Sequence, residues 1–170
     1  MTRKMLDFID DILGKIAVLF VNIAEIMTFS MIFITSYGVV MRYFFRRPEP
    51  VTNELATIML LWGFLFAVPF VEYSDRQIKA DLFTPFMPKG MIKFLHGIIS
   101  PVLAIPYCGI LTWKGWTLAF HSLRMGEKSM SIWGEPLFPI KILIPICYGL
   151  LTLICVRNLA KKIYFYSSEE

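Results

Sequence analysis

Charged residues are scarce along this chain of 170 residues. Asp, Glu, Lys and Arg together make up only 18% of it, whereas hydrophobic residues make up 56%, and the mean hydropathy is +0.62. A typical soluble domain carries about 25% charged residues. The longest polar connection, residues 74–91, is too short to build a hydrophobic core of its own. Within these residues the composition excludes a water-soluble catalytic or nucleic-acid-binding domain, and residues 1–170 are predicted to form one membrane domain.

Cysteine and histidine, the side chains most used in redox and metal chemistry, are also few. Cys108, Cys147 and Cys155 lie in hydrophobic stretches, and no C-x-x-C motif is present. A membrane-bound disulfide oxidase needs exposed cysteine pairs for exchange with its partner, so this class is excluded. His96 and His121 lie at opposite ends of one hydrophobic stretch, which does not favour a shared metal ion. We therefore expect no enzyme activity, no metal and no cofactor in this chain.

Four long hydrophobic segments dominate the sequence and cover residues 16–40, 55–73, 92–120 and 137–156. A helix needs about 20 apolar residues to cross a hydrocarbon layer of about 30 Å. The predicted fold class is therefore an all-α integral membrane protein with four transmembrane helices. No internal repeat relates the first two segments to the last two, so the inverted-repeat pattern of a self-sufficient secondary transporter is missing.

Two shorter segments, residues 5–15 and 75–88, have one apolar and one charged face at helical spacing. We expect each to form a short amphipathic helix on the membrane surface, one at the N-terminus and one between the second and third spans. Arg76, Lys79 and Asp81 of the second helix are predicted to anchor the inner face of the protein.

Lys and Arg are distributed unevenly across the predicted membrane. With four spans, both termini and the connection between spans two and three lie on one side, and this side carries the larger number of basic residues. Because cytoplasmic segments retain positive charge during insertion, the distribution predicts that the N- and C-termini are both cytoplasmic.

Glu25 lies near the middle of the first predicted span, and Asn22 precedes it by one helical turn. A charge at this depth is energetically costly, so we expect Glu25 to have a functional or structural role. One interpretation is a proton-coupling carboxylate, as in small multidrug exporters that carry one essential Glu in their first helix. The other is a polar contact with another helix, in this chain or in a partner. Those exporters are much shorter and have little charge bias, which favours the contact here.

Arg42 and Glu54 flank the short turn between the first two spans. Because the turn is short, the two spans must be antiparallel neighbours, and we expect the two side chains to emerge at one membrane level. The sequence therefore predicts a structural ion pair between Arg42 and Glu54 at the outer turn.

A set of aromatic, charged and proline residues then follows in a fixed order along the chain: Arg42-Tyr43-Phe44, Glu54, Trp62, Phe64, Leu65, Ile78, Asp81, Pro88 and Pro145-x-x-Tyr148-Gly149. Their order and spacing resemble the small membrane subunit (DctQ type) of tripartite ATP-independent periplasmic (TRAP) transporters. The length of the chain and its four predicted spans also fit this family.

The resemblance implies that the chain works with partners in the bacterial inner membrane. A large membrane subunit of about twelve spans would carry the substrate and sodium sites and move its transport domain as an elevator. A periplasmic binding protein would capture an organic acid, such as a C4-dicarboxylate or a sialic acid. The small subunit would brace the fixed scaffold in the lipid bilayer.

For this chain, Asn22 and Glu25 are predicted to contact the large subunit, and the outer loops 46–53 and 122–135 to help dock the binding protein. No nucleic acid is expected among the partners. The alternative is a self-contained proton-coupled multidrug exporter that uses Glu25.

Overall fold

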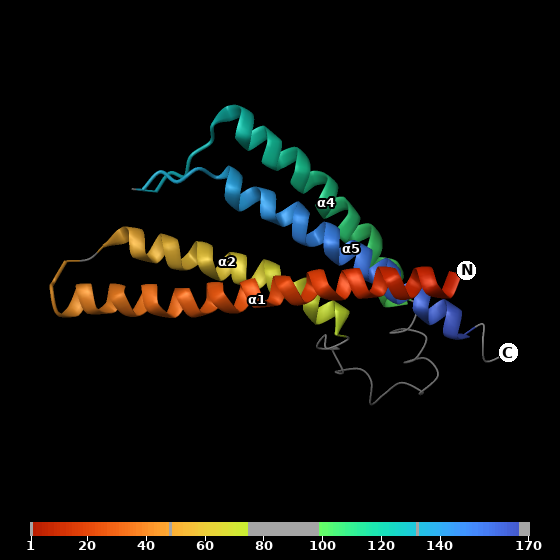
Figure 1. The fold of residues 1–170 in the computed structure, drawn as a ribbon. Helices are drawn as coiled ribbons and strands as arrows, with labels where there is room; N and C mark the ends of the chain where they lie inside the picture. The colour runs from red at the N-terminus through yellow and green to blue at the C-terminus, as the bar shows by residue number, and fades with distance from the viewer. Residues whose placement is uncertain (1, 48, 75–98, 132, 167–170) are drawn as a thin grey trace, which may run out of the picture.

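The computed structural model describes residues 2–47, 49–74, 99–131 and 133–166. These residues form long α-helices and one isolated β-bridge, between Lys128 and Pro136. The helices in the described ranges are α1 (Thr2–Tyr43), α2 (Pro50–Tyr73), α4 (Ser100–Met125) and α5 (Phe138–Tyr166) (Figure 1). The prediction of an all-helical membrane protein is thereby supported, since three helices contain apolar stretches long enough to cross a bilayer: Phe8–Tyr43, Pro50–Tyr73 and Phe138–Lys161.

The fourth predicted span, residues 92–120, lies partly outside the described residues. The part that is described belongs to α4, which is not among the helices that are both long and apolar enough to cross a membrane. A fourth crossing therefore stays a prediction.

The two predicted surface helices are not confirmed. Residues 5–15 are the first part of α1, which continues as one helix of 42 residues, about 63 Å long, to Tyr43. The second segment, with Arg76, Lys79 and Asp81, lies outside the described residues. The N-terminal segment is thus an extension of the first span and not a separate helix.

The described helices form two antiparallel hairpins, α1–α2 and α4–α5, which contact each other mainly through α2 and α5. The hairpins meet at the end that carries both chain termini and diverge toward the other end (Figure 1). Where they meet, Leu13 and Ala17 of α1 pack with Leu150 and Ile154 of α5, and Phe70 of α2 packs against this cluster. We call this the terminal end of the bundle.

Turn chemistry sets the ends of the helices. After α1 the chain turns at Arg46, which has a positive φ of 52°, and Pro50 starts α2 at a position where its missing N–H costs nothing. α4 ends at Gly126, whose φ of 59° is a left-handed conformation that glycine adopts without strain. The amide of Glu127 then donates to the carbonyl of Ser122, which closes the helix end.

Small residues set the spacing within each hairpin. A Cβ atom on Gly38 of α1 would lie 2.7 Å from Cγ2 of Thr52 in α2, and one on Gly115 of α4 would lie 3.0 Å from Cδ of Pro145 in α5. Such close approach of helix backbones is the usual packing mode in membranes, where lipid provides no hydrophobic drive between helices. It also fixes the register of each pair.

The Pro145-x-x-Tyr148-Gly149 motif is explained by this packing. Pro145 and Gly149 face α4, where Gly149 lies beside Thr112. Tyr148 packs against the cluster of Cys108, Leu151 and Cys155 and lines a small apolar cavity together with Leu65 and Val68 of α2. The motif thus lets α5 contact two helices at once, which places it at the centre of the described bundle.

Candidate functional site

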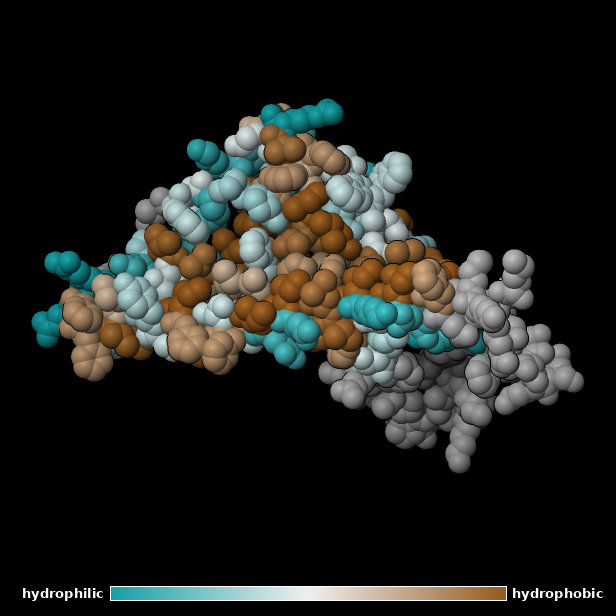
Figure 2. Space-filling model, viewed as in Figure 1, coloured by the Kyte–Doolittle hydropathy of each residue, from teal (hydrophilic) through white to brown (hydrophobic). Residues whose placement is uncertain are grey.

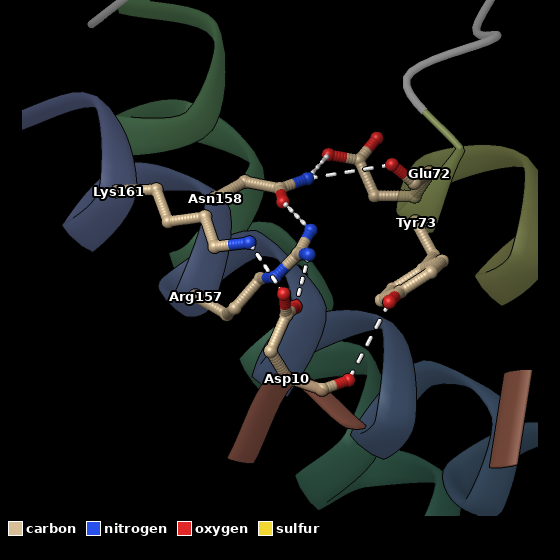
Figure 3. A network of polar contacts seen from close by, with 6 residues as sticks. All are labelled: Asp10, Glu72, Tyr73, Arg157, Asn158 and Lys161. Atoms are coloured by element: carbon tan, nitrogen blue, oxygen red, sulfur yellow. Dashed lines mark hydrogen bonds and ion pairs between the residues drawn. The ribbon is translucent and has the colours of Figure 1, made fainter. Parts of the chain in front are cut away.

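A network of six polar side chains joins three helices at the terminal end (Figure 3). α1 contributes one carboxylate, α2 a carboxylate and a phenol, and α5 two basic side chains and an amide. The members of this terminal network are Asp10, Glu72, Tyr73, Arg157, Asn158 and Lys161.

The Asp10 carboxylate pairs with two basic side chains of α5, Arg157 and Lys161. Arg157 forms an ion pair with one carboxylate oxygen, and Nζ of Lys161 lies 2.6 Å from the other. The Tyr73 hydroxyl donates to the Asp10 carbonyl at 3.4 Å, and the Arg157 guanidinium lies 4.5 Å from the centre of the Tyr73 ring. Asp10 therefore ties α1 to α5 through its carboxylate and to α2 through its carbonyl.

Asn158 connects Asp10's partner to the second carboxylate. Its Nδ2 donates to Oε1 of Glu72 at 3.0 Å and to the Glu72 carbonyl at 3.3 Å, while its Oδ1 accepts from Arg157 at 2.7 Å. Two carboxylates and two basic groups balance one another within the network. Nε of Arg157 has no hydrogen-bond partner among the described residues, but the charges of the network are balanced. Such a network holds helices in one arrangement, because separation would leave a largely buried charge unpaired.

Sequence analysis missed the terminal network. Asp10 and Arg157 lie at opposite ends of the chain, and no spacing rule relates them. The available signal was their shared membrane level: both flank spans on the side that carries the chain termini, and they have opposite charge. That signal is compatible with an Asp10–Arg157 pair, but it does not distinguish Arg157 from the other basic residues nearby in the sequence.

Arg42 and Glu54 are not paired in the structure. Because Gly38 packs against Thr52 in the antiparallel pair, Arg42 extends beyond the level of Glu54 by about 9 Å along the helix axis. Arg42 is exposed, whereas Glu54 is half-buried with an Oε2 that has no hydrogen-bond partner among the described residues. The expectation of one membrane level is corrected by the helix register, and the Arg42–Glu54 pair remains a hypothesis for the assembled protein.

Trp62, like Glu54, has a polar side-chain atom without a hydrogen-bond partner among the described residues. It lies two helical turns after Glu54 on the same side of α2, and its Nε1 is buried without a hydrogen-bond partner in the described part of the chain. The two residues leave one acceptor and one donor unused on one face of α2.

Asn22 and Glu25 lie on the outside of the described bundle. Ala24, between them, is buried against α2, whereas both polar side chains are exposed. The described residues include no hydrogen bond from either side chain. The described helices of this chain therefore provide no polar contact for these two residues. The predicted contact with a partner protein stays a prediction.

The described residues also bring no three His, Cys, Asp or Glu side chains together as metal ligands. Long apolar helices, a polar network that closes one end and polar side chains on an outward face define an integral membrane protein with surfaces suited to other membrane helices.

Comparison with family models identifies the family. Residues 31–164 match the DctQ component of the tripartite ATP-independent periplasmic transporters, and the chain belongs to this family. A comparison with curated proteins finds no match. DctQ proteins work with a large membrane subunit, DctM, and a substrate-binding protein. The match begins at residue 31, so Asp10, Asn22 and Glu25 precede the matched region.

Proposed function

We propose that this small TRAP subunit serves a sodium-coupled transporter of organic acids, of the C4-dicarboxylate or sialic acid type, and braces the fixed scaffold of the large subunit. Sodium and substrate bind in the large subunit on this proposal. The family supports the transporter class, and the exposed position of Glu25 is the observation that carries the bracing role.

Glu25 needs a partner because of its place in α1. It lies within the apolar stretch Phe8–Tyr43, where a lone charge costs at least about 2.5 kcal/mol in lipid. The structure leaves this carboxylate and Asn22 exposed on the bundle surface. A side chain of the large subunit that donates a hydrogen bond relieves this cost and joins the two subunits.

The terminal network supports a bracing role in a second way. An elevator mechanism needs one domain that stays fixed while another slides. A bundle whose two hairpins are tied by Asp10, Arg157 and Glu72 moves as one body, so force on one hairpin is transmitted to the other. Arg76, Lys79 and Asp81 complete this brace as an anchor on the inner membrane surface, with both termini cytoplasmic. The termini share one end of the bundle, as this orientation requires (Figure 1).

The connection between α4 and α5 supports a docking role for the outer loops. It is held by the hydrogen bond from the Ser129 amide to the Glu135 carbonyl and by the ion pair of Lys141 with Glu127. Met130 lies fully exposed at its tip. An ordered loop costs little entropy on binding, so loop 122–135 is suited to contact the periplasmic binding protein. On this proposal loop 46–53 contributes to the same contact.

Reconstitution in liposomes tests the proposal. The chain alone should transport nothing, and sodium-dependent uptake of an organic acid should require the large subunit and the binding protein together. The exposure of Glu25 also suits a proton-coupled exporter. Transport by the chain alone in a proton gradient, lost in Glu25→Gln, would establish that function and overturn the bracing role.

A further inference from the structure

α1 has two exposed faces of different chemistry. On the side that packs against α2, Ala17 and Ala24 are buried and Gly38 contacts Thr52. About 130° around the helix, a row of exposed residues follows the alternating three- and four-residue spacing of a helix-packing seam. We call this row the α1 seam; its members are Asp11, Lys15, Val18, Asn22, Glu25, Phe29, Ile32 and Ser36.

The other exposed face suits lipid. It carries an apolar side chain at each heptad: Ile12, Leu19, Ile26 and Phe33, with exposed fractions of 40%, 56%, 61% and 62%. Between residues 11 and 36, the charged residues and Asn22 thus lie on only one of these two exposed faces. Hydrophilic patches interrupt the hydrophobic surface along α1 (Figure 2). A helix surrounded by lipid alone gains nothing from such sorting.

Hydrogen bonding separates the seam from ordinary polar residues of a membrane helix. The hydroxyls of Ser30 and Thr35 each donate at 2.8 Å to the carbonyl four residues earlier in α1, so they need no partner. Asp11 and Lys15 pair with each other at 2.6 Å. The longer side chains of Asn22 and Glu25 make no hydrogen bond among the described residues. The unmet hydrogen-bonding capacity therefore lies at the centre of the seam.

We infer that one transmembrane helix of the large subunit lies along the α1 seam, on the side of α1 opposite α2, and presents a hydrogen-bond donor to Asn22 and Glu25. This inference rests on the proposed function and names the surface that it uses. The seam spans residues 11–36, about 38 Å, which is one full membrane crossing for a partner helix at a shallow angle.

A second copy of this chain does not suit the seam. Membrane insertion gives both copies the same orientation, so a symmetric pair would place identical residues opposite each other. Glu25 would face Glu25, and Lys15 would face Lys15. A helix of different sequence avoids both repulsions, as the large subunit can.

Site-specific photocrosslinking in the assembled transporter tests the inference. p-Benzoylphenylalanine is placed at Val18, Phe29 or Ile32 of the seam, and at the matched lipid-face positions Leu19, Ile26 or Phe33. The full complex is irradiated in membranes, and adducts are identified by mass. Seam positions should give at least about fivefold more adduct with the large subunit than the lipid-face positions, because a probe reacts only within contact distance.

Equal yields from the two faces would overturn the inference, as would seam adducts with a second copy or with residues 75–98 of the same chain. Co-purification of the large subunit with the unsubstituted, affinity-tagged chain is measured in parallel. If the large subunit co-purifies and the seam gives no adduct with it, the inferred contact at the α1 seam is wrong and the proposed function stands. If the large subunit does not co-purify, the proposed function fails and the seam fails with it.

Discussion

The terminal network and the middle of α1 both carry charged side chains on membrane helices, but they satisfy them differently. Asp10 binds two basic groups of α5 within the chain. Glu25, on the same helix about four turns further along, has no hydrogen-bond partner among the described residues and lies exposed. The difference teaches that a carboxylate on α1 stabilises the fold at the terminal end, whereas a carboxylate in the middle of the same helix is available for contact with another protein.

Position in the bundle explains the difference. The hairpins meet at the terminal end, so two other helices, α2 and α5, supply partners to Asp10 there. Further along, the hairpins diverge and α1 has only α2 as a neighbour in the described structure. Where the hairpins separate, α5 no longer supplies hydrogen-bond partners to α1. Polar side chains of α1 in this part of the bundle can therefore contact a second protein.

The largest effect should come from removing Asp10. Asp10→Ala leaves Arg157 without its carboxylate, and Arg157 is only 13% exposed. We expect the isolated chain to lose about 2–3 kcal/mol of stability, because a charge that is largely buried is left unpaired. SDS-induced unfolding of the detergent-solubilised chain, followed by circular dichroism, measures this loss.

Asp11→Ala is the matched control. Asp11 pairs with Lys15, but both side chains are well exposed, so this change should cost less than about 1 kcal/mol. Equal losses for the two variants would show that the terminal network does not hold the bundle, and the contrast between the two regions would disappear.

Packing of the α4–α5 hairpin gives the next effect. Gly115→Leu forces a side chain into the ring of Pro145, which a Cβ alone would already approach to 3.0 Å. We expect a loss of about 2 kcal/mol, since overpacking shifts both helix backbones. In the same unfolding assay Gly109→Leu should be nearly neutral, because no atom lies within 4 Å of a Cβ built there. A similar loss at both positions would contradict the packing described for α5.

Glu25 should affect assembly and not the isolated chain. Glu25→Leu removes an interhelical hydrogen bond worth about 1–2 kcal/mol in membranes, so recovery of the large subunit on the tagged chain should fall about 5- to 30-fold. SDS-induced unfolding of the chain alone should not worsen. Ile26→Leu, on the lipid face, is the control and should leave both measurements unchanged. Unfolding that worsens as much as in Asp10→Ala would place Glu25 in the fold.

These two regions also show what the sequence could predict. The apolar segments predicted the helices of α1, α2 and α5 because a bilayer imposes one length and one composition on any crossing. The residues of the DctQ resemblance predicted the family. The separation of Arg42 from Glu54 along the helix axis was not predictable from the short turn, because the register of the hairpin is set by Gly38 against Thr52. The terminal network depends on which helices meet, and that follows from packing throughout the chain.

The smallest effect is expected in the loop between α4 and α5, which lies outside the diverging helices and satisfies its charges as the terminal end does. The hydrogen bond from Lys141, 2.5 Å from the Glu127 carboxylate, lowers the pKa of Glu127 below its ordinary value of 4.5. A carboxylate whose pKa is lower in the folded protein stabilises it fully above the unfolded pKa. This contribution is lost as the pH falls from 4.5 through the lower folded pKa.

Amide hydrogen exchange detects this loss locally. The Leu137 amide donates to the Glu127 carbonyl, so it reports on the ordered loop. At pH 7 the Leu137 amide of Glu127→Gln should exchange faster than that of the unsubstituted chain, and the ratio of the two rates should approach one as the pH falls below the lowered pKa of Glu127 and the native carboxylate is protonated. Lys128→Gln changes the charge of the same loop without touching the Lys141 pair and should leave the ratio near one throughout. A ratio for Glu127→Gln that does not change with pH would show that this ion pair does not order the loop, and the loop would then belong with the middle of α1 as a region that depends on a partner.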